Sequence, residues 1–187
     1  MEIEEIQQRL KQAEKLHITE SHQVNETQLA MSNYSGVIEY HAEELVLTVK
    51  AGTPIADIEQ LLAQQGQALT FDVKNNDFTT IGAAYAIGSP ELRDAVLGVK
   101  IIDGQGRILN FGGQVMKNVA GYDVARLLVG SRGKLAVICE ISFKVLPVDY
   151  CQKHDIDTIS NIPNDSAAVV KIEQGLKAIF DPKGIFV

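Results

Sequence analysis

The chain has 187 residues, of which 45% are hydrophobic and 22% charged, so its composition is that of a globular protein and not of a disordered, collagen-like or coiled-coil chain. Its 17 basic and 24 acidic residues give a formal net charge of -7, the wrong sign for gathering nucleic-acid phosphates. The longest apolar run, residues 135–139, is far shorter than the roughly 20 residues that cross a bilayer, so no membrane insertion is expected.

Two features indicate the compartment. The first five residues are mostly acidic, whereas a signal peptide starts with basic and then apolar residues. The two cysteines, Cys139 and Cys151, form no CxxC pair, which is typical of a reducing compartment. A cytoplasmic location is therefore expected.

The first part of the chain alternates helix and strand patterns. Apolar residues at three- and four-residue steps predict an amphipathic helix over about residues 2–15. A short strand over 16–19 and a polar loop over 20–28 follow. The β-branched segments 36–40 and 45–49 are predicted to be two turn-linked strands.

A helix start comes next. Thr53 is a candidate N-cap, and Pro54 suits the first helical position because its missing N–H would be unpaired there. An apolar stripe continues until Gly66, which is expected to end this helix.

The later part is richer in strands. Segments 98–103 and 107–111 flank a glycine-rich turn and predict a β-hairpin. A short helix near 124–128 precedes an alternating strand over 135–145, which Pro147 ends.

The last part begins with a stretch that has no regular pattern. Residues 148–165 lack periodicity and are predicted to be an irregular connection, and a final helix includes Ile172, Leu176 and Ile179. The whole order predicts an α+β fold: two lobes over residues 1–147, divided at about residue 70, then the connection and the C-terminal helix.

One long segment, residues 112–133, contains the motif Lys-Asn-Val-Ala-Gly-Tyr-Asp followed by Gly-Ser-Arg-Gly. It closely resembles the FAD-binding domain of the vanillyl-alcohol-oxidase (PCMH-type) flavoproteins, and most of all the FAD-binding subunit of bacterial glycolate oxidase. Further matches follow in the same order as in that family: residues 36–40, 45–54, 80–82, 93–98 and 180–186. The resemblance implies a small N-terminal α/β lobe, a second lobe with a mainly antiparallel sheet, and FAD in the cleft between them.

The resemblance also implies the cofactor site. Glycines suit it because they let backbone N–H groups approach a diphosphate closely. The residues that inherit a cofactor-binding role are Thr80, Ile81, Gly82, Ala83, Lys117, Asn118, Tyr122, Asp123, Gly130, Gly133, Val137 and Ile138. A second interpretation stays open, in which Tyr122 and Asp123 start a helix and the glycines serve turns and caps.

The chain also departs from the family pattern. The family's glycine-rich diphosphate loop falls near residues 19–22, which contain no glycine, and Glu20 would place a carboxylate where phosphates must lie. Ala83 replaces a second glycine, and the segment 88–92 is shortened. The cap portion of the family is missing between Pro147 and the closing Asp-Pro-x-Gly.

Two functions follow from this comparison. The resemblance implies an FAD-binding component of a glycolate-oxidase-like 2-hydroxy-acid oxidoreductase, with a larger flavoprotein subunit and an iron–sulfur subunit as partners. The alternative is a structural or assembly subunit that keeps the fold without FAD. No catalytic residue can be named, turnover by the chain alone is not expected, and the four histidines form no metal-binding pattern.

Overall fold

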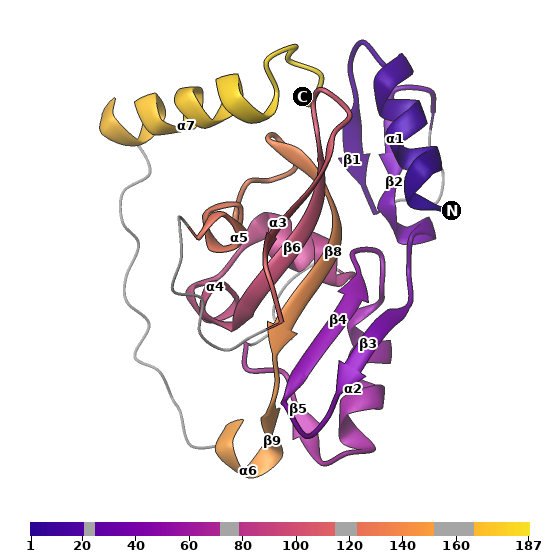
Figure 1. Ribbon diagram of the computed structural model, residues 1–187, viewed down its shortest axis with the longest axis vertical. Helices are drawn as coiled ribbons and strands as arrows, with labels where there is room; N and C mark the ends of the chain where they lie inside the picture. The colour runs from indigo at the N-terminus through magenta and orange to yellow at the C-terminus, as the bar shows by residue number, and fades with distance from the viewer. Residues whose placement is uncertain (21–24, 72–78, 115–122, 152–166) are drawn as a thin grey trace.

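The computed structural model describes residues 1–20, 25–71, 79–114, 123–151 and 167–187. Its central element is a five-stranded sheet in the order β3-β4-β8-β6-β7, in which every neighbouring pair is antiparallel (Figure 1). The strands are β3 (Val37–His41), β4 (Val46–Lys50), β6 (Val96–Asp103), β7 (Ile108–Gly112) and β8 (Ala136–Lys144). The two predicted strand pairs and the long strand are present, and the α+β class is confirmed.

The N-terminal segment lies at one end of this sheet (Figure 1). Helix α1 (Ile3–Gln12) buries Ile6 and Leu10 completely, as its apolar spacing predicts. Strand β1 (His17–Thr19) pairs in parallel with β2 (Gln28–Ala30), and a short 3-10 helix, η1 (Met31–Asn33), follows. The predicted loop is therefore wrong at its last residue, where Gln28 opens a strand.

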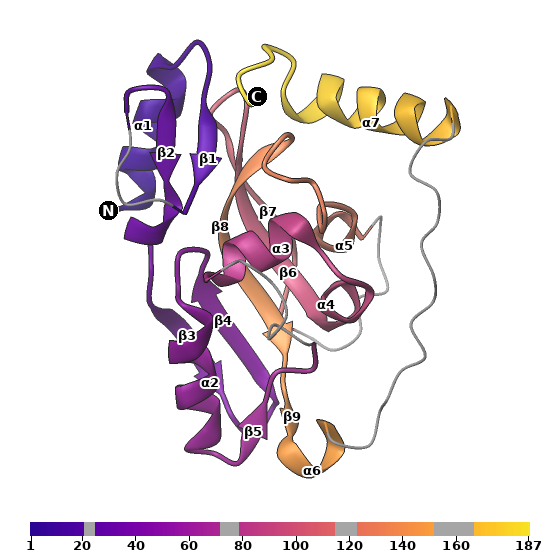
Figure 2. The same cartoon turned by 180° about the vertical axis from the view of Figure 1, so that it is seen from behind.

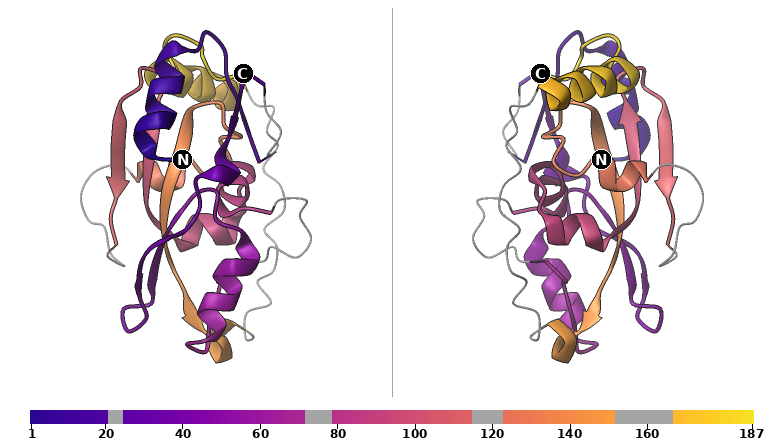
Figure 3. Two further views of the ribbon diagram at one scale, coloured as in Figure 1. Left: turned by 90° about the vertical axis from the view of Figure 1, so that its right-hand side faces the viewer. Right: turned by 90° about the vertical axis from the view of Figure 1, so that its left-hand side faces the viewer.

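Three helices lie on the same side of the sheet (Figures 2 and 3). They are α2 (Ile55–Ala63), α3 (Ile81–Ile87) and α4 (Pro90–Ala95). Sequence patterns indicate α2 but not the two shorter helices, whose starts are fixed by side-chain caps. Thr80 accepts the Ala83 N–H at the start of α3, and Ser89 accepts the Leu92 N–H at the start of α4.

Thr53 does not cap α2. Its hydroxyl donates to backbone oxygens of Lys50 and Gly36 at 2.7 and 3.1 Å, and it accepts the Gly36 N–H at 2.9 Å. The residue directly before the helix is Pro54. Thr53 thus links the end of β4 to the start of β3, and its hydroxyl is already used by these backbone groups.

Besides β8, the last part of the chain contributes three helices and one short strand within the described ranges. Helix α5 (Val124–Leu127) precedes β8, and β9 (Leu146–Pro147) pairs with β5 (Gln67–Ala68). Helix α6 (Val148–Cys151) corrects the start of the predicted irregular connection, whose remaining residues lie outside the described ranges. Helix α7 (Ala167–Phe180) is the predicted final helix.

The last residues return to the N-terminal segment. Leu16 donates its N–H to the Ile185 oxygen at 2.8 Å, and Leu16 and Phe186 form a parallel bridge. The division into two lobes near residue 70 stays a prediction, and strands from both sides of that residue share the central sheet. Within the described ranges, no helix has the length and apolar character needed to span a membrane.

Candidate functional site

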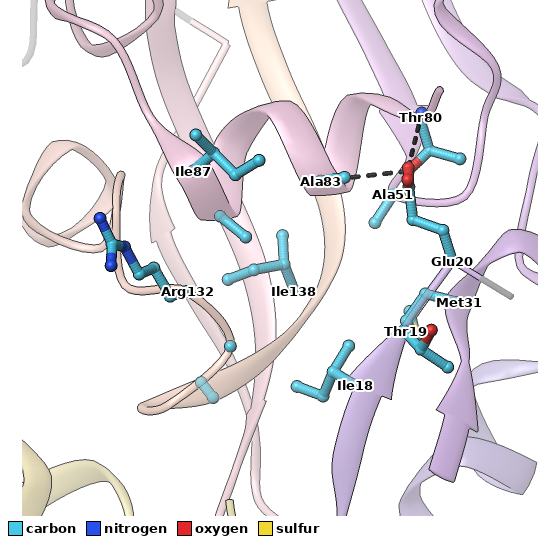
Figure 4. Close-up of a pocket in the computed structure, with 14 residues that line it drawn as sticks. Ile18, Thr19, Glu20, Met31, Ala51, Thr80, Ala83, Ile87, Arg132 and Ile138 are labelled. Atoms are coloured by element: carbon cyan, nitrogen blue, oxygen red, sulfur yellow. Dashed lines mark hydrogen bonds between the residues drawn. The ribbon is translucent and has the colours of Figure 1, made fainter. Parts of the chain in front are cut away.

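A cavity of about 510 Å³ lies between the end of β1, helix α3 and the first part of β8 (Figure 4). This volume is in the range of small-molecule sites. Its wall consists mainly of apolar side chains and of residues with little or no side chain. The lining residues are Ile18, Thr19, Glu20, Met31, Ala51, Thr80, Gly82, Ala83, Ala86, Ile87, Arg132, Gly133, Ala136 and Ile138.

The first turn of α3 packs directly on the end of β4. Gly82 donates its N–H to the Ala51 oxygen at 2.7 Å, and a Cβ atom at Gly82 would lie 2.7 Å from that same oxygen. Only glycine allows the helix to come this close without moving the strand. Close packing on Ala51 therefore explains why residue 82 is a glycine. The start of α3, with Thr80, Gly82 and Ala83, lines the cavity.

The turn at residues 130–133 forms a second part of the wall. Gly130 donates its N–H to the Tyr85 oxygen at 3.0 Å, and Arg132 donates to the Ala86 oxygen at 2.8 Å, so the turn is fixed to the end of α3. Gly133 has a φ of +72°, a conformation that favours glycine, and its missing side chain would lie 3.5 Å from Ile18. A side chain here would fill part of the space between the turn and β1.

On the opposite side of the cavity, Glu20 links the end of β1 to the start of α3. Its Oε1 atom accepts the Thr80 N–H at 2.8 Å and the Thr80 hydroxyl, and it accepts the Thr79 N–H at 3.3 Å. The Oε2 atom has one longer contact, with the Thr79 N–H at 3.4 Å. A carboxylate thus lies at the start of α3, and none of the ion pairs within the described ranges involves it.

Among the described residues of the wall, the charged side chains are Glu20 and Arg132. Figure 4 shows them on opposite sides of the space into which Ile18 and Ile138 point. Arg132 is exposed and has a φ of +53°, unusual for a residue other than glycine. The cavity therefore has an acceptor side at Glu20, a cationic edge at Arg132 and an apolar floor between them.

Two groups behind the wall stay protonated. Burial raises the pKa of the Tyr85 hydroxyl, which donates a hydrogen bond to the Ala125 oxygen. Burial also raises the pKa of Cys139 to about 12. Neither group lines the cavity, so neither supplies it with a nucleophile or base at neutral pH.

The structure brings five of the predicted site residues to the cavity: Thr80, Gly82, Ala83, Gly133 and Ile138. Four others lie elsewhere. Ile81 and Val137 are fully buried in the core, Asp123 caps α5 by accepting the Arg126 N–H at 3.1 Å, and Gly130 lies in the adjoining turn. Asp123 and Gly130 therefore have the cap and turn roles of the second interpretation, and Ile81 and Val137 have core positions. Lys117, Asn118 and Tyr122 lie outside the described residues.

Sequence reasoning missed most of the β1 side of the wall, including Ile18 and Met31. The available signal was the end of the first predicted strand, where the resemblance places a diphosphate loop and where Glu20 lies. Ala86, Ile87 and Ala136 gave no signal, because their role depends on the unpredicted helix α3. In the described part of the chain, no group of three or more His, Cys, Asp and Glu side chains could hold a metal ion.

Comparison with known proteins identifies the fold. Residues 12–112, more than half of the chain, match the family described as FAD binding domain. The chain belongs to this family. It is 46% identical to glycolate oxidase subunit GlcE of Escherichia coli (strain K12) in an alignment of 123 residues. The match covers 61% of this chain and 35% of that protein. The predicted family and its cofactor, FAD, are thus confirmed.

Two further similarities agree with this FAD-binding domain. The chain is 30% identical over 148 residues to glycolate oxidase subunit GlcD of Bacillus subtilis (strain 168), which covers 75% of this chain and 31% of that protein. A solved structure of alkyldihydroxyacetonephosphate synthase has a TM-score of 0.60 at 19% identity and covers 78% of this chain and 32% of that one, which shows the shared fold. The chain spans about a third of the length of these proteins.

The cavity accommodates one part of FAD better than another. Its apolar floor and small residues suit planar rings and a ribose, whose contacts are mainly van der Waals. A diphosphate needs N–H donors, and those of Thr79 and Thr80 already bind the Glu20 carboxylate. The wall thus fits the uncharged portions of FAD, whereas phosphates at this end meet a fixed negative charge.

Proposed function

We propose that this chain is the FAD-binding component of a glycolate-oxidase-like 2-hydroxy-acid oxidoreductase. The observation that carries the proposal is the cavity, which brings five predicted cofactor-binding residues together in a domain of the FAD-binding family. GlcE and GlcD are named as subunits of glycolate oxidase, and this supports the same substrate class here.

In this proposal the chain's own residues provide shape and orientation. Ile18, Ile138 and Ile87 form apolar surfaces for the rings of the cofactor, while Ala83 and Gly133 leave room for it. Bound FAD supplies the hydride acceptor that no side chain can provide. The described wall contains no candidate for a general base other than Glu20, which hydrogen bonds hold at Thr80.

Partners are part of the proposal, because GlcE and GlcD are named as subunits of glycolate oxidase. A second flavoprotein subunit would complete the substrate side of the site, and an iron–sulfur subunit would receive the electrons. The cytoplasm is the proposed location. A chain of this kind is not expected to oxidise a hydroxy acid alone.

The absorption spectrum of the purified protein tests the proposal. We expect visible flavin bands after native purification, or after incubation with excess FAD followed by gel filtration. The variant Ala83→Phe fills the cavity and should lose these bands while keeping the far-UV circular dichroism of the parent. A colourless parent protein after both treatments would contradict stable FAD binding by this chain.

A second function, a structural subunit without cofactor, is favoured by one observation. The Glu20 carboxylate occupies N–H donors that face the cavity. If this function is correct, the protein stays colourless and Glu20→Gln does not change that. Binding of FAD by the wild type excludes it.

A further inference from the structure

Glu20 and Thr80 lie 60 residues apart in the sequence, yet they join two walls of one cavity. Four donors converge on Oε1: the N–H groups of Thr79 and Thr80, the Thr80 hydroxyl and, at 3.5 Å, the Thr79 hydroxyl. Charged acceptors form stronger hydrogen bonds than neutral ones with such donors. The donors of Thr79 and Thr80 therefore suit a negatively charged acceptor, and the protein's own Glu20 carboxylate fills that role.

A phosphate that binds the donors of Thr79 and Thr80 would have to displace Glu20 or lie beside it. Like charges at close range in a partly dry cavity repel each other strongly. In the described part of the chain no cation pairs with Glu20, so nothing there offsets the repulsion. Arg132, the cationic residue of the wall, lies on the other side of the cavity (Figure 4).

We propose that Glu20 is a specificity-determining residue that competes with the phosphates of the cofactor for the Thr79 and Thr80 donors. The inference rests on the proposed function and adds to it. The wild-type cavity accepts the uncharged part of a flavin nucleotide readily, and it binds the diphosphate only when the carboxylate leaves Thr80. Removing the charge at this position increases affinity for FAD but not for a flavin without phosphates.

The test compares dissociation constants of FAD and riboflavin, measured by flavin fluorescence, for the wild type and five variants of the full chain. Glu20→Gln keeps the size of the side chain and removes its charge, and Glu20→Gly removes the side chain. Glu26→Gln is the matched control, because Glu26 is an exposed carboxylate near Glu20 in the sequence and is not among the lining residues of this cavity. It changes the net charge by the same amount.

The expected result is an increase of about tenfold or more in FAD affinity for Glu20→Gln and Glu20→Gly, as the repulsion predicts. Riboflavin affinity should stay within about twofold, and Glu26→Gln should behave like the wild type. Glu20→Asp, which keeps the charge on a shorter side chain, should not reproduce the gain of Glu20→Gln.

Two outcomes overturn the inference in distinguishable ways. Equal FAD affinity for the wild type and Glu20→Gln, with a loss in Arg132→Ala, would place the phosphates at Arg132 and leave FAD binding intact. Failure of wild type, Glu20→Gln and Glu20→Gly alike to bind FAD or riboflavin would overturn both the inference and the proposed function. Circular dichroism of each variant shows whether it is folded.

Discussion

Two regions of the molecule hold a carboxylate over backbone amides, but they do so differently. At the C-terminal segment, the fully buried Asp181 accepts the N–H groups of Ile185 and Phe186 at 2.8 and 2.9 Å and pairs with Lys177 at 2.7 Å. At the cavity, the half-buried Glu20 accepts donors of Thr79 and Thr80 without a cation from the described residues. Within the described part of the chain, the first carboxylate has a cationic partner and the second has none.

The comparison teaches that the same local geometry can serve stability or binding. A buried charge with a cation and two amides organises the chain around it, and its loss leaves several groups unpaired. A carboxylate in a cavity wall can be replaced by a ligand at lower cost, because water and the ligand can satisfy the donors that it leaves. The variants below separate these roles.

The largest effect is expected for Asp181→Ala. The change leaves the amides of Ile185 and Phe186 without their acceptor and removes the carboxylate paired with Lys177, whose ammonium keeps the Lys134 and Phe186 oxygens. We expect a loss of about 3 kcal/mol in the free energy of unfolding. Urea unfolding followed by circular dichroism measures it. A loss below about 1 kcal/mol would show that the C-terminal segment contributes little to the fold.

A smaller loss in the free energy of unfolding is expected for Gly82→Ala, at the contact between α3 and the end of β4. In Gly82→Ala the new Cβ atom would lie 2.7 Å from the Ala51 oxygen, so helix or strand must shift, at a cost of about 1–3 kcal/mol. Gly113→Ala is the control, because its Cβ atom would meet no atom within 4 Å. Equal unfolding midpoints for both variants would contradict the close packing of the cavity wall.

Alkaline pH should destabilise the fold. Burial raises the pKa of Cys139 from 9.0 to about 12 and raises the pKa values of the Tyr34 and Tyr85 hydroxyls, whereas the unfolded chain ionises at ordinary values. The contribution of Cys139 to stability is therefore full below about pH 9 and lost as the pH rises toward about 12.

Urea unfolding at several pH values checks this prediction. The free energy of unfolding should fall steadily above about pH 9, and Cys139→Ser should begin its decline only near the pKa of tyrosine, about 10. A free energy of unfolding that stays constant from pH 8 to 11 would show that these groups are not protected from solvent.

The smallest change in stability is expected for Glu20→Gln. Its amide oxygen can still accept the Thr80 N–H, and the side chain is partly exposed, so we expect less than about 1 kcal/mol. Unfolding in urea next to Asp181→Ala provides the comparison. If both variants lost the same stability, the difference drawn between the two carboxylates would be wrong.

The sequence predicted elements whose signal is local. The apolar spacing that places Ile6 and Leu10 on one face defines α1, and alternation defines β8. Helices α3 and α4 were missed because seven and six residues are too few for a helical period to show, and α3 is rich in glycine and alanine. Thr53 was assigned as a cap because the competing acceptors, Lys50 and Gly36, are set by strand pairing.

The candidate site was predictable only in part, for the same reason. The resemblance indicated Thr80, Gly82, Ala83, Gly133 and Ile138, which the fold gathers at one cavity. It also indicated residues such as Val137, whose side chain the strand turns into the core. The contact between Glu20 and Thr80 joins segments far apart in the sequence, and no local pattern reveals it.

The central claim is that the cavity between β1, α3 and the turn at residues 130–133 binds FAD. The most direct measurement is a titration of the isotope-labelled protein with FAD, followed by backbone amide chemical shifts. The account predicts the largest shifts at Thr80, Ala83 and Gly133. Shifts confined to another surface, such as the sheet edge at Asn110 and Gly113, or no shifts at saturating FAD, would contradict it.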